Sequence, residues 1–380
     1  MRGALTRSEL VERTGLSRTT VSNLLNELID DELVSDETDG PAEDDEPRSG
    51  GRPSRKVRLD VRAGAAISVD IGARHLAVAV GDVGHRVLAR HWVPLEHGHG
   101  VEDGLQTAGR LVDSSLAEAG VDRSQVIGAA VGLPAPIKHP EGTVASTNIL
   151  PGWSEVRLAP ELSEHLGMPV VVDNDANLGA LAEARWGAGA EGGQVAYIKV
   201  ATGIGAGLIH DGRLFRGATG TAGEIGHMTV KEDGPVCRCG SRGCLEHYAG
   251  GTAILEALRQ SDPGVDTVEA LVDRALAGDP SCVRVIADAG THIGVAVANL
   301  INLLGPDRVV VGGELSRAGE ILLEPLRTAV GRSAVHAARE SVVICEGSLG
   351  ADAEVLGGLL LVVTEPGLFG ADDLLGRIAA

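Results

Sequence analysis

Apolar residues recur along most of this chain as short unbroken runs that alternate with runs of helical spacing. The stretch AAISVDIG, at residues 65–72, reads as a buried strand that ends in a glycine turn, and HLAVAVGDVGHRVLARH continues with two further strands. The later stretch QVAYIKVATGIGAGLIHDGRLFRG repeats the order of strand, glycine-rich turn, strand, tight turn and strand. This internal repeat predicts two similar α/β lobes with a cleft between them.

Helices and further strands fill the rest of the main body. The pattern predicts a helix over residues 104–119, a strand in VIGAAVGLPAPI, and a buried strand followed by a helix in VVVDNDANLGALAEARWG. A long buried helix (AGTHIGVAVANLINLLGP), a strand entering a Gly-Gly turn (DRVVVGGELS) and a closing strand and helix (SVVICEGSLGADAEVLGGLLLV) follow. We expect the first lobe to cover residues 61–180 and the second lobe residues 181–380.

The N-terminal residues carry two short helical patterns on either side of Gly15. Thr6 and Glu9 have the spacing of a capping box for the first helix, and Ser17 is suited to cap the second. Short polar residues at the start of the second helix favour a helix-turn-helix, which presents that helix to the major groove, over an ordinary helical hairpin. The candidate DNA contacts are Ser17, Arg18, Thr19, Thr20, Ser22 and Asn23. Only residues 1–4 precede the first helix, where such a unit normally has a supporting helix, so either the translation start is assigned too late or this domain is incomplete.

A charge reversal follows the second helix. Residues 36–47 hold seven acidic side chains and no basic one, so we expect this insert to be disordered. The stretch SGGRPSRKVRLD comes next, and its Arg52 and Arg55 are suited to contact phosphates. We interpret residues 1–60 as a winged helix-turn-helix domain whose wing is interrupted by the acidic insert; a solvated linker is the alternative.

Composition narrows the classes of partner. The formal net charge of -20 argues against general affinity for nucleic acid or anionic membranes, but leaves room for a small basic DNA-binding unit. No signal peptide and no uninterrupted apolar run of membrane-spanning length is visible. We therefore expect a soluble cytoplasmic protein, with Cys282 and Cys345 as reduced core thiols.

The other three of the five cysteines cluster in one loop. His227, Cys237, Cys239 and Cys244 offer one imidazole and three thiolates, a complete tetrahedral set for structural zinc. The alternative is a disulfide pair plus a spare thiol, which would require an oxidising compartment. We expect a zinc knuckle over residues 227–246.

Polar residues flank this loop and follow a buried strand elsewhere. Glu224 and Glu246 stand on either side of the knuckle, where they suit a polyhydroxylated ligand; the alternative is that both are solvated loop charges. The run DNDAN, residues 173–177, lies at the carboxyl end of a strand, where open α/β folds bind ligands.

The ordered set VDIG, DNDAN, ATGIGAG, GEIGH, CRCGSRGCLE and VVGGELS closely resembles the ROK family of sugar kinases and sugar-responsive repressors. The resemblance extends over essentially the full length and implies an actin-like, hexokinase-type fold with two lobes. It maps sugar contacts onto Asn174, Asp175, Glu224, His227 and Glu246, and the kinase base onto Asp175. Candidate phosphate and nucleotide contacts are Asp70, Gly72, Thr202, Gly203, Gly205, Gly312 and Gly313.

The chain departs from the family's kinases in the first phosphate loop. DIGARH stands where those kinases carry a Gly-Gly-Thr type of loop, so Arg74 and His75 are bulky where backbone should approach phosphate. Ala201 likewise replaces a usual glycine. Family members with an N-terminal helix-turn-helix are mostly regulators, so we expect a sugar-responsive regulator, a repressor, that binds a DNA operator as a homodimer or homotetramer. The alternative is a sugar kinase that uses Mg-ATP, with a vestigial N-terminal domain.

Overall fold

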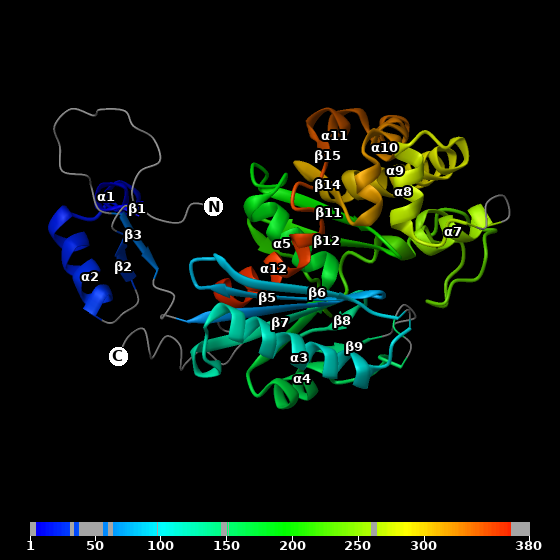
Figure 1. Cartoon of the computed structure of the whole chain (residues 1–380). Helices are drawn as coiled ribbons and strands as arrows, with labels where there is room; N and C mark the ends of the chain where they lie inside the picture. The colour runs from blue at the N-terminus through cyan, green and yellow to red at the C-terminus, as the bar shows by residue number, and fades with distance from the viewer. Residues whose placement is uncertain are drawn as a thin grey trace.

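The computed structural model describes residues 5–30, 34–37, 56–59, 64–96, 98–145, 150, 152–259 and 264–365. A small N-terminal unit lies beside two larger lobes, each built on a five-stranded sheet (Figure 1). The small unit has a three-stranded sheet of order β1-β3-β2. Its elements are β1 (Leu5–Thr6), α1 (Arg7–Thr14), α2 (Arg18–Asp30), β2 (Val34–Glu37) and β3 (Lys56–Leu59).

The predicted helix signals of the N-terminal unit are confirmed. The backbone N–H of Glu9 donates to Thr6 Oγ1 at 3.2 Å, and the Thr6 N–H donates to Glu9 Oε2 at 2.7 Å, which completes the capping box. Gly15 ends α1 in the left-handed conformation with φ 69°, and the Thr20 N–H donates to Ser17 Oγ at 3.1 Å. Val21 and Leu25 form the buried face of α2.

One boundary predicted for this unit is wrong. The acidic insert was placed from residue 36, but Asp36 and Glu37 belong to β2, where they pair with Val57 and Lys56 of β3. Ladder hydrogen bonds to a neighbouring strand therefore outweigh the acidic composition at these two positions. Residues 38–47, together with Arg52 and Arg55, lie outside the described residues.

The two lobes confirm the internal repeat. In the first lobe β4 (Ala65–Ile71), β5 (His75–Asp82) and β6 (Val87–Pro94) form an antiparallel meander, as do β11 (Gln194–Val200), β12 (Ile204–His210) and β13 (Arg213–Leu214) in the second. The sheet orders, β10-β7-β4-β5-β6 and β13-β12-β11-β14-β15, place the first strand of each meander at the centre. Parallel strands complete each sheet on the other side: β7 (Val126–Leu133) and β10 (Val170–Asn174), and β14 (Arg308–Gly312) and β15 (Val343–Glu346).

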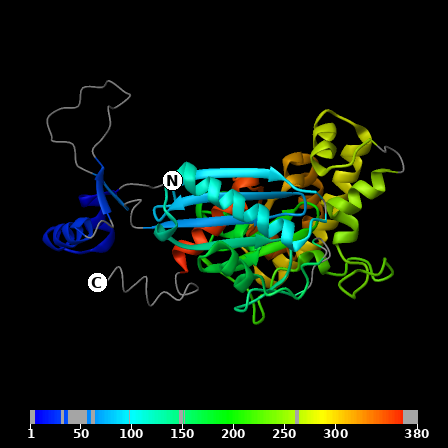
Figure 2. The ribbon, with the colours of Figure 1, turned by 60° about the horizontal axis from the view of Figure 1, so that its bottom comes forward.

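Helices cover the sheets and connect the lobes. In the first lobe α3 (Val101–Ala119) crosses β4, β5 and β6 (Figure 2), and α4 (Leu158–Leu166) packs against β10. The small strands β8 (Ile137–Lys138) and β9 (Thr143–Val144) pair beside them. The helices of the second lobe are α6 (Glu246–Ala249), α7 (Gly251–Arg259), α8 (Val268–Leu276), α9 (Pro280–Leu304), α10 (Glu320–Ser333) and α11 (His336–Ser341).

Two helices lie between the sheets. The helix α5 (Asp175–Trp186) packs against β11 and β12, and α12 (Ala353–Thr364) packs against α5 and against β4, β5 and β7 (Figure 1). The chain therefore returns at its end to the sheet of the first lobe, which the predicted division at residue 180 does not include.

Among the described residues, α9 is the one helix long and apolar enough to be a candidate membrane span. Half of its most apolar window is buried inside the protein, and it packs against α6, α7, α8 and α10. These contacts are those of a core helix.

Candidate functional site

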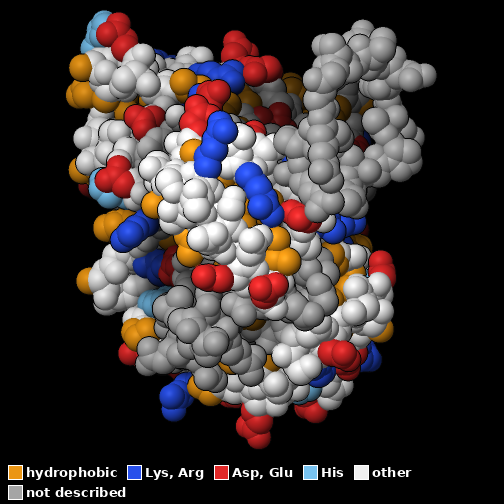
Figure 3. Space-filling model, turned by 90° about the vertical axis from the view of Figure 1, so that its left-hand side faces the viewer, with side chains coloured by type: hydrophobic (Ala, Val, Ile, Leu, Met, Phe, Trp, Pro, Cys, Tyr) orange, Lys and Arg blue, Asp and Glu red, His pale blue; other side chains and the backbone are white. Residues whose placement is uncertain are grey.

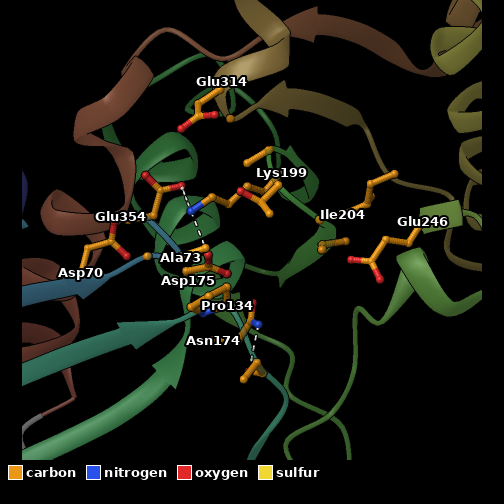
Figure 4. A pocket seen from close by; sticks show the side chains of 18 of the residues that line it. Asp70, Ala73, Pro134, Asn174, Asp175, Lys199, Ile204, Glu246, Glu314 and Glu354 are labelled. Atoms are coloured by element: carbon orange, nitrogen blue, oxygen red, sulfur yellow. Dashed lines mark hydrogen bonds and ion pairs between the residues drawn. The ribbon is translucent and has the colours of Figure 1, made fainter. Parts of the chain in front are cut away.

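A cavity of about 740 Å³ lies between the lobes. Its walls come from the β4–β5 turn, the β10–α5 junction, the β11–β12 turn, the cysteine-rich loop and the start of α12 (Figure 4). All five predicted sugar-binding residues line it, although they come from distant parts of the sequence: Asn174, Asp175, Glu224, His227 and Glu246. The fold therefore brings the predicted set together around one space.

Asn174 and Asp175 stand where β10 ends and α5 begins. Asn174 caps α5, because its Oδ1 accepts from the Ala176 N–H at 2.9 Å while its Nδ2 donates to the Ala135 carbonyl at 3.1 Å. Asp175 is buried, and its Oδ2 accepts a 2.8 Å hydrogen bond from Lys199 Nζ. Local capping and the neighbouring strand thus fix both side chains before any ligand arrives.

Glu224 and Glu246 form the acidic wall beside the cysteine-rich loop. Burial, with the charges of Glu246 and Asp175, raises the pKa of Glu224 to about 7. Glu246 Oε2 accepts from Arg238 Nη2 at 3.1 Å, so an arginine of the knuckle steadies this carboxylate. Carboxylates of this kind accept hydrogen bonds from hydroxyl groups, which fits the predicted polyhydroxylated ligand.

The residues of the knuckle form a candidate metal site. The ligand atoms of His227, Cys237, Cys239 and Cys244 all lie within 4.8 Å of one another. The Cys239 and Cys244 sulfurs are 3.7 Å apart, as are Cys237 Sγ and His227 Nδ1. Zinc–sulfur bonds of about 2.3 Å in a tetrahedron give sulfur–sulfur edges of about 3.8 Å, so this set fits zinc. His227 Nε2 faces Glu224 Oε2 at 3.9 Å, which links the metal site to the acidic wall.

The β4–β5 turn of the predicted phosphate site is filled by its own histidine. His75 Nε2 lies 2.8 Å from Asp70 Oδ2, and the imidazole rests on Gly72, where an added Cβ would lie 2.3 Å from a ring carbon. Trp92 stacks with the same imidazole, with 6.2 Å between the ring centroids. Backbone that would have to approach a phosphate is therefore covered, as the bulk of DIGARH led us to expect.

The β11–β12 turn is open by comparison. Thr202, Gly203 and Gly205 line the cavity, and Gly313 lines it from the end of β14. Gly312 was predicted to be a nucleotide contact, but it does not line the cavity. A Cβ on Gly312 would lie 2.2 Å from the Tyr197 hydroxyl, so this glycine makes room for a ring from the adjacent strand.

Two polar residues in the cavity were missed from the sequence. Lys199, on β11, bonds both Asp175 and Glu354, the latter at 3.0 Å from the first turn of α12. A lysine inside the otherwise apolar run QVAYIKV was a signal that could have marked its position. Nothing in the sequence connects it to Glu354, because only the return of α12 places that carboxylate here.

The predicted DNA-contacting residues lie on the N-terminal half of α2. Ser17, Arg18, Thr19, Thr20 and Asn23 are exposed, and Ser22 is half-buried. Figure 3 shows the molecule from this side, where basic and acidic side chains lie among uncharged ones. The described part of the unit thus leaves the start of α2 free to contact DNA.

Two family models match the chain. One, described as the ROK family, covers residues 66–365, and the other, described as the MarR family, covers residues 1–40. A xylose repressor from Caldicellulosiruptor bescii is 30% identical over 374 residues, which span 95% of this chain and 92% of the repressor. The similarity to this relative therefore includes the N-terminal unit.

Solved structures of a regulator and of a kinase match different shares of the chain. A ROK family transcriptional regulator, described as a homologue of the E. coli MLC protein, superposes with a TM-score of 0.76 at 26% identity, covering 98% of this chain and 94% of that one. A ROK family glucokinase from Streptomyces griseus, solved with glucose and AMPPNP, gives a TM-score of 0.69 at 30% identity, covering 78% of this chain and 99% of the kinase. The regulator matches nearly the whole chain, whereas the kinase leaves about a fifth of it unmatched.

Proposed function

Because the chain belongs to the ROK family, we propose that it is a DNA-binding transcriptional regulator of carbohydrate metabolism, a cytoplasmic repressor that responds to a sugar. Support comes from the helix-turn-helix unit, whose second helix has an exposed polar start. Further support comes from the full-length similarity to a relative named a xylose repressor. The ligand would be a sugar or sugar derivative.

The sugar would bind beside the knuckle. Glu224, Glu246 and Asp175 all line the cavity, and hydroxyl groups can donate to their carboxyl oxygens. His227, Cys237, Cys239 and Cys244 would hold a structural zinc, which when bound orders a loop too poor in apolar residues to order itself. His227 would then be fixed through Nδ1, with Nε2 directed at Glu224.

The observation that carries regulator over kinase is the His75 imidazole on Gly72. It covers the turn that would receive nucleotide phosphates, and it bonds to one oxygen of Asp70 at the end of β4. A nucleotide would have to displace this ring and its stacking on Trp92. The cleft is thus suited to sensing a sugar rather than to phosphorylating it.

The sugar would act by shifting a population of conformations. The proposed sugar contacts come from both lobes, so a bound sugar would favour one angle between the lobes over others. In a homodimer or homotetramer this change would alter the spacing of two DNA-reading helices, which must match two half-sites about one helical turn apart.

The test is binding of DNA from the protein's own locus, measured by fluorescence anisotropy with and without D-xylose, D-glucose or N-acetyl-D-glucosamine. We expect tight binding that one sugar weakens, and Arg18→Ala should lower affinity about tenfold. Arg284→Ala, which removes an exposed arginine from α9, is the matched control and should change nothing. Absence of DNA binding with and without every sugar would overturn the proposal.

A second candidate, an ATP-dependent sugar kinase, is favoured by one observation. Asp175, to which the resemblance assigns the kinase base, lines the cavity together with residues of the β11–β12 turn. This function predicts sugar-dependent ADP release from Mg-ATP that Asp175→Asn abolishes. Absence of turnover with all three sugars would leave the cleft as a sensor.

A further inference from the structure

Lys199 is a buried cation at the base of the cavity. It projects from β11 toward the starts of α5 and α12 (Figure 4). Its Nζ lies 2.8 Å from Asp175 Oδ2 and 3.0 Å from Glu354 Oε1, and the three side chains are 12%, 8% and 6% exposed. A strand of the second lobe is thereby joined to both helices that lie between the sheets.

The carboxylates around Lys199 make this buried position favourable for a positive charge. The N-termini of α5 and α12 carry partial positive charge, which by itself disfavours a cation. Asp175 and Glu354, each in the first turn of its helix, outweigh that repulsion. Burial alone would lower the pKa of Lys199, but Asp175, Glu354 and Asp70 raise it well above the ordinary value, so the lysine stays protonated.

The ammonium group has three N–H donors, and the described residues use two of them. Lys199 also lines the cavity, so its third donor is available to a ligand oxygen. Next to it, Asp175 Oδ2 keeps a lone pair, while Oδ1 accepts from the Ala176 N–H at 2.8 Å. A donor and an acceptor therefore stand side by side on one wall. A hydroxyl group, which both donates and accepts, matches such a pair.

We propose that Lys199 is a ligand-binding residue of this cleft, and that with Asp175 it forms a donor–acceptor pair that takes up one sugar hydroxyl. The inference rests on the proposed sugar-sensing function and adds a residue to it. Glu354 is a positioning residue that holds the ammonium in place. The hydroxyl would donate a hydrogen bond to Asp175 and accept one from Lys199, and no proton is transferred.

A purely structural ion pair would give a different response to substitution. Removing Lys199 alone leaves two buried carboxylates without their cation, which destabilises the fold whatever the role of the lysine. Removing one charge of each sign, as in Lys199→Met/Glu354→Gln, keeps the net charge of the triad at its native value and leaves one carboxylate, not two, without the cation, so most of the stability should return. If the pair is only structural, thermal stability and sugar affinity should recover together; if Lys199 binds the ligand, only stability should recover.

The experiment measures sugar affinity by calorimetry and Tm on the full-length, zinc-loaded protein. D-xylose, D-glucose and N-acetyl-D-glucosamine are the probes, tested first on the wild type and then on Lys199→Met and Lys199→Met/Glu354→Gln. We expect the double variant to have a near-native Tm and an affinity at least about tenfold weaker, the cost of losing a charge-assisted hydrogen bond. Lys199→Met alone is expected to lower both the Tm and the sugar affinity. If Lys199→Met does not fold, the double variant alone provides the test.

The matched control is Lys138→Met/Glu155→Gln, which removes the exposed ion pair at 3.1 Å between β8 and the loop before α4. It should leave Tm and affinity unchanged. Native affinity in the Lys199→Met/Glu354→Gln variant would overturn the inference and leave the sugar-sensing function standing. A wild type that binds none of the three sugars would count against that function itself, and the inference would fall with it.

Discussion

The two halves of the cleft differ in how their polar groups are engaged. In the half beside the knuckle, the partner that the described residues give the Glu224 side chain is His227 at 3.9 Å, and Glu246 has Arg238 on one oxygen. In the half formed by the β4–β5 turn, Asp70 is bonded to His75, whose ring covers Gly72. The first half presents its acceptors to a ligand, whereas in the second half His75 already takes one oxygen of Asp70 and covers the turn.

The two turns belong to repeated hairpins, so they can be compared directly. The β4–β5 and β11–β12 hairpins are the same supersecondary unit, and both turns face one cavity. Thr202 and Gly203 of the second turn are half-buried and line the cavity, whereas an imidazole covers Gly72 of the first turn. The backbone fold is therefore compatible with either function, and the side chains at the turns decide between them.

The largest expected effect comes from the metal site. Chelation of the metal, or Cys239→Ser, should weaken sugar binding about 100-fold, because the loop that carries Glu246 and faces Glu224 loses its order. The lobes have their own apolar cores and should keep most of their thermal stability. Calorimetric sugar titration before and after chelation, with metal content by atomic emission, measures this. Cys345→Ser, a thiol on β15 away from the set, is the control, and unchanged affinity after complete metal loss would contradict the prediction.

Matched substitutions of two glutamates, Glu246 and Glu346, test whether the ligand binds in one half of the cavity. Glu246→Gln should weaken sugar binding about 10- to 100-fold, because a charged acceptor of the hydroxyl groups becomes a neutral amide. Glu346→Gln is the matched change at the end of β15, on the other side of the same cavity, and should leave affinity within about twofold. Equal losses in the two variants would show that the halves do not divide the ligand as proposed.

Local signals predicted most of the fold and much of the site. The capping box at Thr6 and Glu9 and the four residues of the candidate metal site lie close together in sequence, so spacing alone reveals them. The strand AAISVDI and its later counterpart were equally visible as unbroken apolar runs.

Contacts between distant segments could not be read in this way. The Lys199–Glu354 pair exists because α12 returns to the first lobe, and the contact of Gly312 with Tyr197 exists because their strands are adjacent. Asp36 likewise looked like part of a disordered insert until its pairing with β3 was known. Each of these depends on which strands and helices become neighbours, and one-dimensional spacing does not specify that.

Removing His75 from the β4–β5 turn should make this half of the cavity more accessible to a nucleotide. His75→Gly removes the ring from Gly72 and frees Asp70, so we expect affinity for AMPPNP with Mg²⁺ to rise about tenfold while sugar affinity stays the same. His91→Gly removes an imidazole from the adjacent strand β6 and is the control. Fluorescence titration with a labelled nucleotide checks the result. An unchanged nucleotide affinity would mean that the histidine is not what closes this half.

The smallest expected effect is a pH dependence of the free energy of unfolding that is caused by His75. Burial alone would lower the pKa of His75, but the hydrogen bond and charge of Asp70 outweigh burial and raise it. A histidine whose pKa is higher in the folded state stabilises that state fully below its unfolded value of about 6.5, and this contribution disappears as pH rises through the folded pKa.

The free energy of unfolding of the wild type minus that of His75→Gln should therefore fall as pH rises from 6 to 9. Asp70 does not disturb this window, because its pKa is lowered by Lys199 and His75 against the effect of burial, and its contribution is lost only in acid. Urea unfolding followed by circular dichroism at each pH gives the difference. A flat curve for His75→Gln would show that Asp70 does not hold His75 protonated, and that the ring closes the turn by packing alone.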